Sequence, residues 1–164
     1  MKNLSNNSNQ DAKEKVPVLV VGIGNLLLKD DGLGIHAIRR LEEMGVPPGV
    51  ELIDGGTSGL DLLNDFGRAK KVVVIDAVKG GGEPGAIYRF SADEVHPDRM
   101  PLTSMHQLNL HEVLAVAKQT GDMPDKVIVI GVEPKAIEVD LELSPEVAAK
   151  LDRVCELVLQ EIKG

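Results

Sequence analysis

The fold of this chain is decided by the stretch Val18-Leu-Val-Val-Gly-Ile-Gly-Asn-Leu-Leu-Leu-Lys-Asp-Asp-Gly-Leu-Gly34. It begins as an apolar run, turns at glycines, carries the acids Asp30 and Asp31, and continues into an amphipathic helical pattern. A strand, loop and helix in this order place the loop at the carboxyl end of a sheet, where open α/β folds bind ligands. Because two carboxylates would repel a phosphate group, the loop indicates a cation site rather than a nucleotide site.

The composition fits a single domain with an aliphatic core. The chain has 164 residues, 43% of them apolar, and its only aromatic residues are Phe66, Tyr88 and Phe90. The net charge of -8 and the scarcity of aromatic rings argue against a nucleic-acid surface. A single cysteine, Cys155, excludes an internal disulfide.

The first 15 residues are polar and rich in Asn, Ser and Lys, so we expect a disordered tail rather than a signal peptide. No apolar run approaches the roughly 20 residues that span a bilayer. We therefore expect a cytoplasmic protein that does not contact the membrane, and a monomer.

Apolar runs alternate with helical patterns after the tail. The pattern predicts strands at 16–23, 50–53, 72–75, 86–90 and 127–132, and helices at 33–44, 58–66, 105–119 and 144–163. This alternation is typical of a single α/β sandwich, here residues 16–164, with a largely parallel sheet. The loop before strand 86–90 is too short for a helical crossover, so we expect that strand to be antiparallel at an edge.

Three acids follow predicted strands. Asp31 comes after the first strand, Asp54 ends the second and Asp76 ends the third. The carboxyl ends of parallel strands share one edge, where three carboxylates would repel one another unless a cation binds there. Each acid alone could simply cap the next helix. The three together favour a site.

The segment Ser104-Met-His-Gln-Leu108 adds an imidazole, because His106 falls in the first turn of a predicted helix. Two carboxylates and one imidazole suit nickel, zinc, iron or manganese. Three protein ligands leave coordination positions open for a substrate. The alternative is a surface histidine at a helix start.

Other motifs are incomplete. The glycines at 22 and 24 lack the third glycine of a dinucleotide loop. His111-Glu112 lacks the second histidine of a zinc protease, since residue 115 is alanine. No Gly-x-Ser-x-Gly nucleophile motif is present.

Four landmarks in order are specific in combination: Gly22-Ile-Gly-Asn-Leu-Leu-Leu-Lys-Asp-Asp-Gly-Leu-Gly34, Asp54-Gly-Gly-Thr57, Val74-Ile-Asp-Ala77 and His106-Gln-Leu108. With them the sequence resembles the hydrogenase maturation endopeptidases over nearly the whole chain after the tail. The resemblance implies a three-layer sandwich, with a twisted, mostly parallel sheet between helices on both faces. It also implies removal of a C-terminal extension from the precursor of a nickel–iron hydrogenase large subunit.

By this resemblance, Asp31, Asp76 and His106 fall on metal-binding positions, and the nickel is expected to arrive bound to the precursor. Other divalent metals fit the same ligands. The catalytic residue stays open among Asp31, Asp76 and Asp54. We expect Asn25, Gly55, Gly56 and Thr57 to contact the substrate. Binding requires a neutral His106, so recognition should weaken at acidic pH.

The mechanism stays open at this point. Nickel could polarise the scissile carbonyl or activate water, or it could only position the peptide while Asp54 or another acid moves the proton. Two other functions compete with the peptidase. One is a metal-binding or metal-sensing module without enzymatic activity, and the other is a nucleotide-binding domain.

Overall fold

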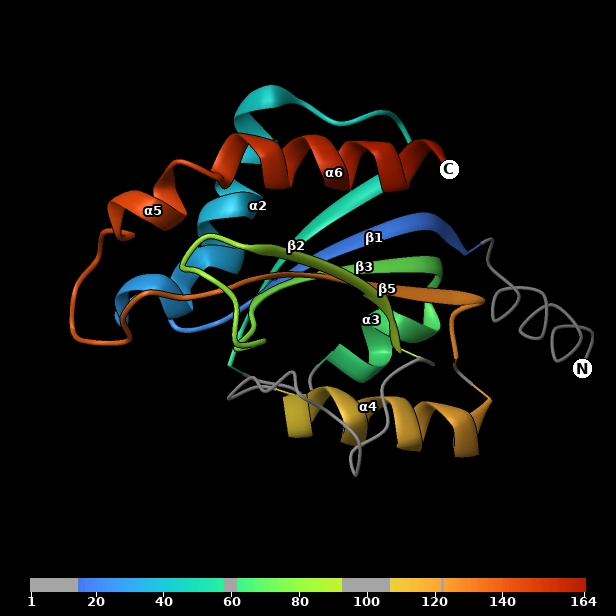
Figure 1. Cartoon of the computed structure of the whole chain (residues 1–164). Helices are drawn as coiled ribbons and strands as arrows, with labels where there is room; N and C mark the ends of the chain where they lie inside the picture. The colour runs from blue at the N-terminus through green and yellow to red at the C-terminus, as the bar shows by residue number, and fades with distance from the viewer. Residues whose placement is uncertain (1–14, 58–61, 93–106, 122) are drawn as a thin grey trace, which may run out of the picture.

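The computed structural model describes residues 15–57, 62–92, 107–121 and 123–164. In these residues a five-stranded sheet has the order β2-β1-β3-β5-β4 (Figure 1). The strands are β1 (Val16–Ile23), β2 (Val50–Gly56), β3 (Ala69–Ala77), β4 (Ile87–Ser91) and β5 (Lys126–Val132). All neighbouring pairs are parallel except β4 with β5, which confirms the predicted antiparallel edge strand.

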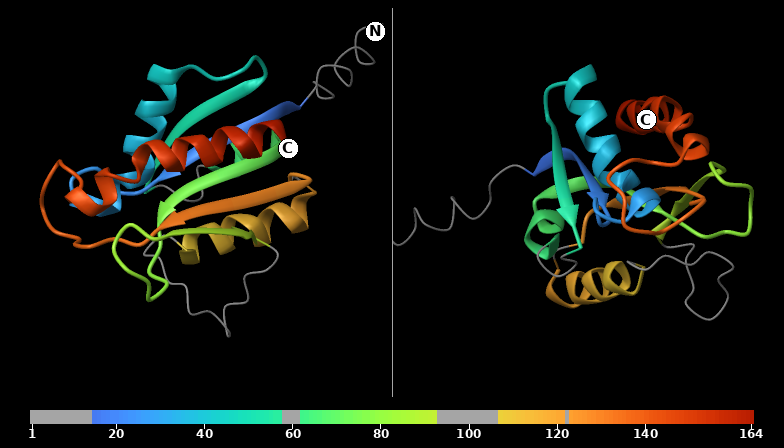
Figure 2. Two further views of the ribbon diagram at one scale, coloured as in Figure 1. Left: turned by 45° about the horizontal axis from the view of Figure 1, so that its top comes forward. Right: turned by 90° about the vertical axis from the view of Figure 1, so that its left-hand side faces the viewer.

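Helices cover both faces of the sheet, so the molecule has three layers (Figure 2). The helices α2 (Leu33–Met44) and α6 (Leu151–Lys163) lie on one face. The helices α3 (Leu63–Gly67) and α4 (Gln107–Thr120) lie on the other. The layered α/β fold expected from the sequence is confirmed. Among the described residues, no helix is both long enough and apolar enough to span a bilayer.

The central strands are buried on both faces because their side chains alternate between two cores. Val20 belongs to the core under α2 and α6, whereas its neighbours Leu19 and Val21 belong to the core under α3 and α4. The same alternation along β3 explains its uninterrupted run of β-branched residues. Burial on both faces is what fixes these strands at the centre of the sheet.

Two glycines allow α2 to pack very close to the sheet. A Cβ atom at Gly22 would lie 2.2 Å from the carbonyl oxygen of Gly34, and one at Gly34 would lie 2.4 Å from that of Ile23. Any side chain at either position would push the helix away from β1. The close packing brings the short 3-10 helix η1 (Lys29–Gly32), which precedes α2, against the carboxyl end of the sheet.

The predicted helix over 144–163 is wrong, because the structure divides it into α5 (Pro145–Ala148) and α6. At the division the Lys150 N–H bonds to the Val147 carbonyl, three residues back instead of four. Ser144 occupies the cap position, and Pro145 begins α5 as predicted, but the Ser144 hydroxyl makes no cap hydrogen bond. That hydroxyl donates to Asp30 instead.

Other boundaries shift by a few residues. The strands β2 and β3 extend beyond the predicted 50–53 and 72–75, so Asp54 and Asp76 lie inside strands rather than after them. The described part of the helix predicted over 58–66 is α3, and the described part of the helix predicted over 105–119 is α4, which ends at Thr120. The predicted tail lies outside the described residues except for Lys15.

Candidate active site

Asp31 lies in η1, directly after the loop that leaves β1. Its side chain is buried, and its Oδ2 accepts a hydrogen bond from the Asn25 N–H at 3.0 Å. The loop closes on itself because Gly24 has φ +143° and no side chain, since a Cβ there would lie 1.9 Å from the Asp31 carbonyl oxygen. Gly24 therefore serves to position Asp31, not to bind a dinucleotide.

Asp76 lies near the end of β3, the strand next to β1. It is buried, and it pairs with Gly131 on β5. The preceding residue, Ile75, pairs with Gly22 on β1, and η1 packs against β3. The structure thus brings Asp31 and Asp76 to the same carboxyl edge of the sheet.

Asp54 differs from these two acids because it is exposed. It pairs with Gly22 from the edge strand β2, and its Oδ1 accepts the N–H of Gly56 at 3.1 Å. The carboxylate therefore faces water at the same edge of the sheet.

Helix capping does not account for these acids. The cap residue of α2 is Gly32 and that of α3 is Leu62, and neither helix has a side-chain cap hydrogen bond. Asp76 precedes the loop to β4 rather than a helix. The capping alternative is wrong for Asp31, and it fits neither of the other two.

His106 lies outside the described residues. Within the described part of the chain, no three His, Cys, Asp or Glu residues form a group that could hold a metal ion. The predicted set of Asp31, Asp76 and His106 is therefore represented by its two acids alone, and the three-ligand site stays a prediction.

The two loops expected to contact substrate are joined. The Gly24 N–H donates to the Gly56 carbonyl at 2.9 Å, which ties the loop after β1 to the end of β2. Asn25 is half-buried, and its Oδ1 accepts the Leu27 N–H at 3.0 Å. Gly55 and Gly56 are half-buried and Thr57 is exposed. These residues form a continuous rim beside the acids, and their contact with substrate stays a prediction.

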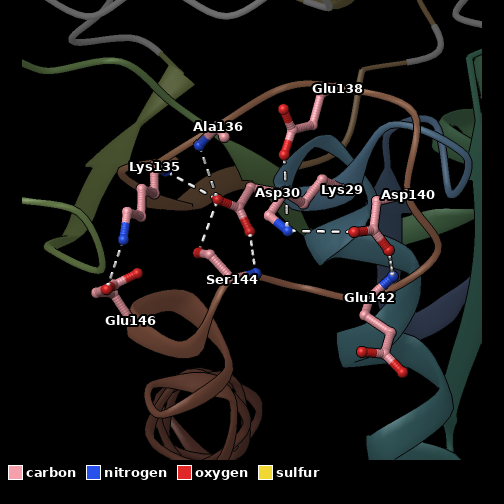
Figure 3. Close-up of polar contacts among 9 residues, drawn as sticks. All are labelled: Lys29, Asp30, Lys135, Ala136, Glu138, Asp140, Glu142, Ser144 and Glu146. Atoms are coloured by element: carbon pink, nitrogen blue, oxygen red, sulfur yellow. Dashed lines mark hydrogen bonds and ion pairs between the residues drawn. The ribbon is translucent and has the colours of Figure 1, made fainter.

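Asp30 has a role that the sequence did not indicate. Its side chain is fully buried, and Figure 3 shows it facing the segment 135–144. Its Oδ2 accepts the N–H of Lys135 at 2.8 Å and that of Ala136 at 3.1 Å, and its two oxygens accept the Ser144 N–H and hydroxyl, each at 2.8 Å. The acidic pair is thus divided between two tasks, and no local pattern marks the division because these donors lie more than a hundred residues away.

Glu133 is a second buried acid that sequence reasoning missed. Its Oε1 accepts the N–H of Gly80 at 2.8 Å, the N–H of Gly82 at 3.0 Å and the hydroxyl of Tyr88 at 2.7 Å. Burial of the phenol, together with this hydrogen bond, raises the pKa of Tyr88. Glu133 therefore holds the loop that follows Asp76.

The chain is similar to known proteins in sequence and in fold. A family model described as hydrogenase maturation protease matches residues 35–161. The chain is 34% identical over 148 residues to the hydrogenase 2 maturation protease of Escherichia coli, covering 89% of this chain and 90% of that protein. It is 36% identical over 160 residues to a putative hydrogenase maturation protease of Methanocaldococcus jannaschii, covering 92% and 99%.

Solved structures agree with these relatives. The hydrogenase maturating endopeptidase HybD from Escherichia coli superposes with a TM-score of 0.81 at 34% identity, covering 90% of this chain and 92% of that chain. The [NiFe] hydrogenase maturation protease HybD from Thermococcus kodakarensis superposes with a TM-score of 0.77 at 28% identity, covering 89% and 99%. Sequence and fold are therefore similar over almost the full length of both neighbours.

Proposed function

Since this chain belongs to the family of hydrogenase maturation proteases, we propose that it removes a C-terminal extension from the precursor of a nickel–iron hydrogenase large subunit. A member of this family is a peptidase, and so a hydrolase. The reaction takes place in the cytoplasm, after nickel has been inserted into the precursor.

The observation that supports this proposal is the pair of buried acids at one edge of the sheet. Asp31 lies in η1, after β1, and Asp76 lies near the end of the neighbouring strand β3; both are buried and neither caps a helix. Two buried carboxylates at one edge of the sheet are costly to keep charged unless hydrogen bonds, a cation or a proton compensate them. A nickel ion carried by the precursor supplies that charge as part of the substrate.

We assign the ligands and the proton transfer to different residues. Asp31, Asp76 and His106 bind the precursor's nickel, and this places the scissile peptide over the rim of Asn25 and Gly55-Gly56-Thr57. Hydrolysis also needs a group that accepts a proton from water and returns one to the leaving amine. Asp54 suits that task because its carboxylate is exposed at the same edge.

The test is mass spectrometry of a purified precursor, with and without bound nickel, after incubation with the chain. We expect trimming of the nickel-loaded precursor only. Asp31→Asn, Asp76→Asn and His106→Ala should each slow trimming by about 100-fold or more, because each removes a ligand. Asp125→Asn is the matched control, since Asp125 is an exposed acid in the loop before β5.

Normal trimming by all three variants would show that the ligand assignment is wrong. Equal trimming of the nickel-free precursor would show that the peptidase does not require nickel in its substrate. Tight metal binding by the isolated chain, with no change in the mass of any precursor, would favour the metal-binding module instead.

A further inference from the structure

Exposed apolar side chains gather beside the candidate active site. Among the residues that the structure describes, the exposed large apolar side chains are Leu27, Met44, Val116, Val139 and Leu141. Leu27, Val139 and Leu141 come from two adjacent segments, and their exposed fractions are 59%, 89% and 60%. We name these three residues the apolar patch. A single exposed apolar residue is ordinary, whereas several together indicate an interaction surface.

Backbone pairing brings the two segments together. Leu28 and Asp140 form a parallel β-bridge. The Asp140 N–H donates to the Leu27 carbonyl at 3.0 Å, and the Lys29 N–H donates to the Asp140 carbonyl at 2.8 Å. Leu27 therefore flanks the bridge on one segment, and Val139 and Leu141 flank it on the other.

The segment that carries Val139 and Leu141 is fixed at both ends. Asp30 binds the N–H groups of Lys135 and Ala136 at one end and Ser144 at the other (Figure 3). Between these anchors, Lys29 forms ion pairs with Asp140 at 3.3 Å and Glu138 at 3.9 Å. Holding apolar side chains in water does not stabilise the fold, but a surface ordered in advance loses less entropy when it binds a partner.

The position of the patch identifies its occupant. Leu27 shares a loop with Asn25, whose N–H donates to the Asp31 carboxylate. The Leu27 N–H in turn donates to the Asn25 side chain. The loop that positions Asp31 therefore also carries Leu27, so the patch is continuous with the edge that holds Asp31. Continuity with the metal-binding edge favours the precursor over a second copy of this chain.

The charge around the apolar patch indicates the chemical character of the precursor surface that would bind it. Residues 135–142 contain one base, Lys135, and three acids, Glu138, Asp140 and Glu142. Lys29 pairs with two of these acids. Glu142 is exposed next to Leu141. A complementary surface would be apolar at its centre and basic at its edge.

We propose that the apolar patch is the docking surface for the folded body of the hydrogenase precursor, separate from the edge that binds its nickel and its scissile peptide. This inference rests on the proposed function. It assigns to the loop after β1 a second task, which is to hold the precursor by protein–protein contact while Asp31 meets the metal.

The test measures binding of the nickel-loaded precursor to the full chain by biolayer interferometry, together with KM and kcat for trimming. Val139→Ser/Leu141→Ser should raise Kd and KM by about tenfold or more and leave kcat within about twofold, because the contact is lost but the acids remain. Met44→Ser/Val116→Ser is the matched control, since it removes two exposed apolar side chains elsewhere, and it should bind as the wild type does. Glu142→Lys should slow association by a few-fold at low salt.

Wild-type affinity in the Val139→Ser/Leu141→Ser variant would overturn the proposal, and so would a wild-type chain that does not bind the precursor. A wild type that binds through the patch but leaves the precursor's mass unchanged keeps the docking surface and refutes the proposed peptidase. Trimming with unchanged KM in the Val139→Ser/Leu141→Ser variant keeps the proposed peptidase and refutes the docking surface. Analytical ultracentrifugation of the chain alone supplies another decisive outcome, because a dimer that the patch variant disrupts would make a second copy the occupant and overturn the proposal.

Discussion

Asp30 and Asp31 are adjacent in sequence and both buried, yet they belong to two different regions of the molecule. The Asp30 carboxylate is bound by donors 105 to 114 residues away and anchors the segment 135–144. The Asp31 carboxylate accepts an N–H only six residues away, at the edge that also carries Asp76. The comparison teaches that burial alone does not identify a functional acid. The origin of its hydrogen-bond donors separates Asp30, which anchors a distant segment, from Asp31, which accepts an N–H of its own loop.

The Asp30 region also stores backbone strain. Lys29 has φ +49°, in the left-handed region that residues other than glycine rarely adopt. Its N–H and its ammonium group both bind Asp140, so the surrounding contacts hold this conformation. The segment 135–144 thereby fixes the loop that presents Asp31.

Removing the anchor should have the largest effect. Asp30→Ala leaves the buried N–H and hydroxyl of Ser144 and the partly buried N–H groups of Lys135 and Ala136 without their acceptor, so we expect a loss of about 3–5 kcal/mol in the free energy of unfolding. Asp31→Asn keeps an oxygen for the Asn25 N–H and should cost less than about 1 kcal/mol. Urea unfolding followed by circular dichroism checks both. Equal losses would break the distinction between the two acids.

Lengthening each acid by one methylene sharpens the same distinction. Asp31→Glu keeps a carboxylate on η1 at the carboxyl edge of the sheet, and we expect it to retain at least about a tenth of the wild-type trimming rate. Asp30→Glu overfills a site with 0% exposure and should cost about 1–3 kcal/mol. The rate comes from precursor mass spectrometry and the stability from urea unfolding. A stable Asp30→Glu variant beside an inactive Asp31→Glu variant would contradict this assignment.

Glu133 tests whether an acid bound by three donors always behaves as an anchor. Glu133→Gln keeps the size of the side chain but weakens the acceptor for Gly80, Gly82 and Tyr88, so we expect a loss of about 1–2 kcal/mol. Thermal unfolding measures the loss. The pKa of Tyr88 should fall toward its ordinary value, because one of the causes that raise it is removed, and ultraviolet titration of the phenol checks this. An unchanged pKa would mean that burial alone raises it.

The smallest effect concerns pH. Burial lowers the pKa of His36 on α2, and a hydrogen bond with the Leu141 backbone opposes the shift. Because the unfolded chain binds this proton more readily than the folded chain, stability should fall as pH drops below about 6.5, by at most about 1.4 kcal/mol per pH unit. Comparing urea unfolding of the wild type and His36→Gln between pH 7.5 and 5 isolates this contribution. Identical pH profiles would exclude His36 as the cause.

Much of the fold follows from the sequence because it depends on local pattern. The predicted bounds of β1 and α2 are confirmed residue for residue, since an apolar run buried on both faces and an amphipathic period are legible without knowing the neighbours. The antiparallel edge strand follows from a short loop, which excludes a crossover helix. The expected parallel strands and the family landmarks place Asp31, Asp54 and Asp76 at one edge.

Only the tertiary structure decided the separate tasks of Asp30 and Asp31 and the different exposure of Asp54 and Asp76. Local spacing cannot show that Asp30 meets Ser144, that this contact uses the hydroxyl expected to cap a helix, or that Asp54 stays exposed while Asp76 is buried. Hydrogen bonds and burial depend on which segments the sheet and helices bring together. The sequence determined which residue types stand at the edge of the sheet, and long-range packing determined which of them anchor a distant segment, which are buried and which are exposed.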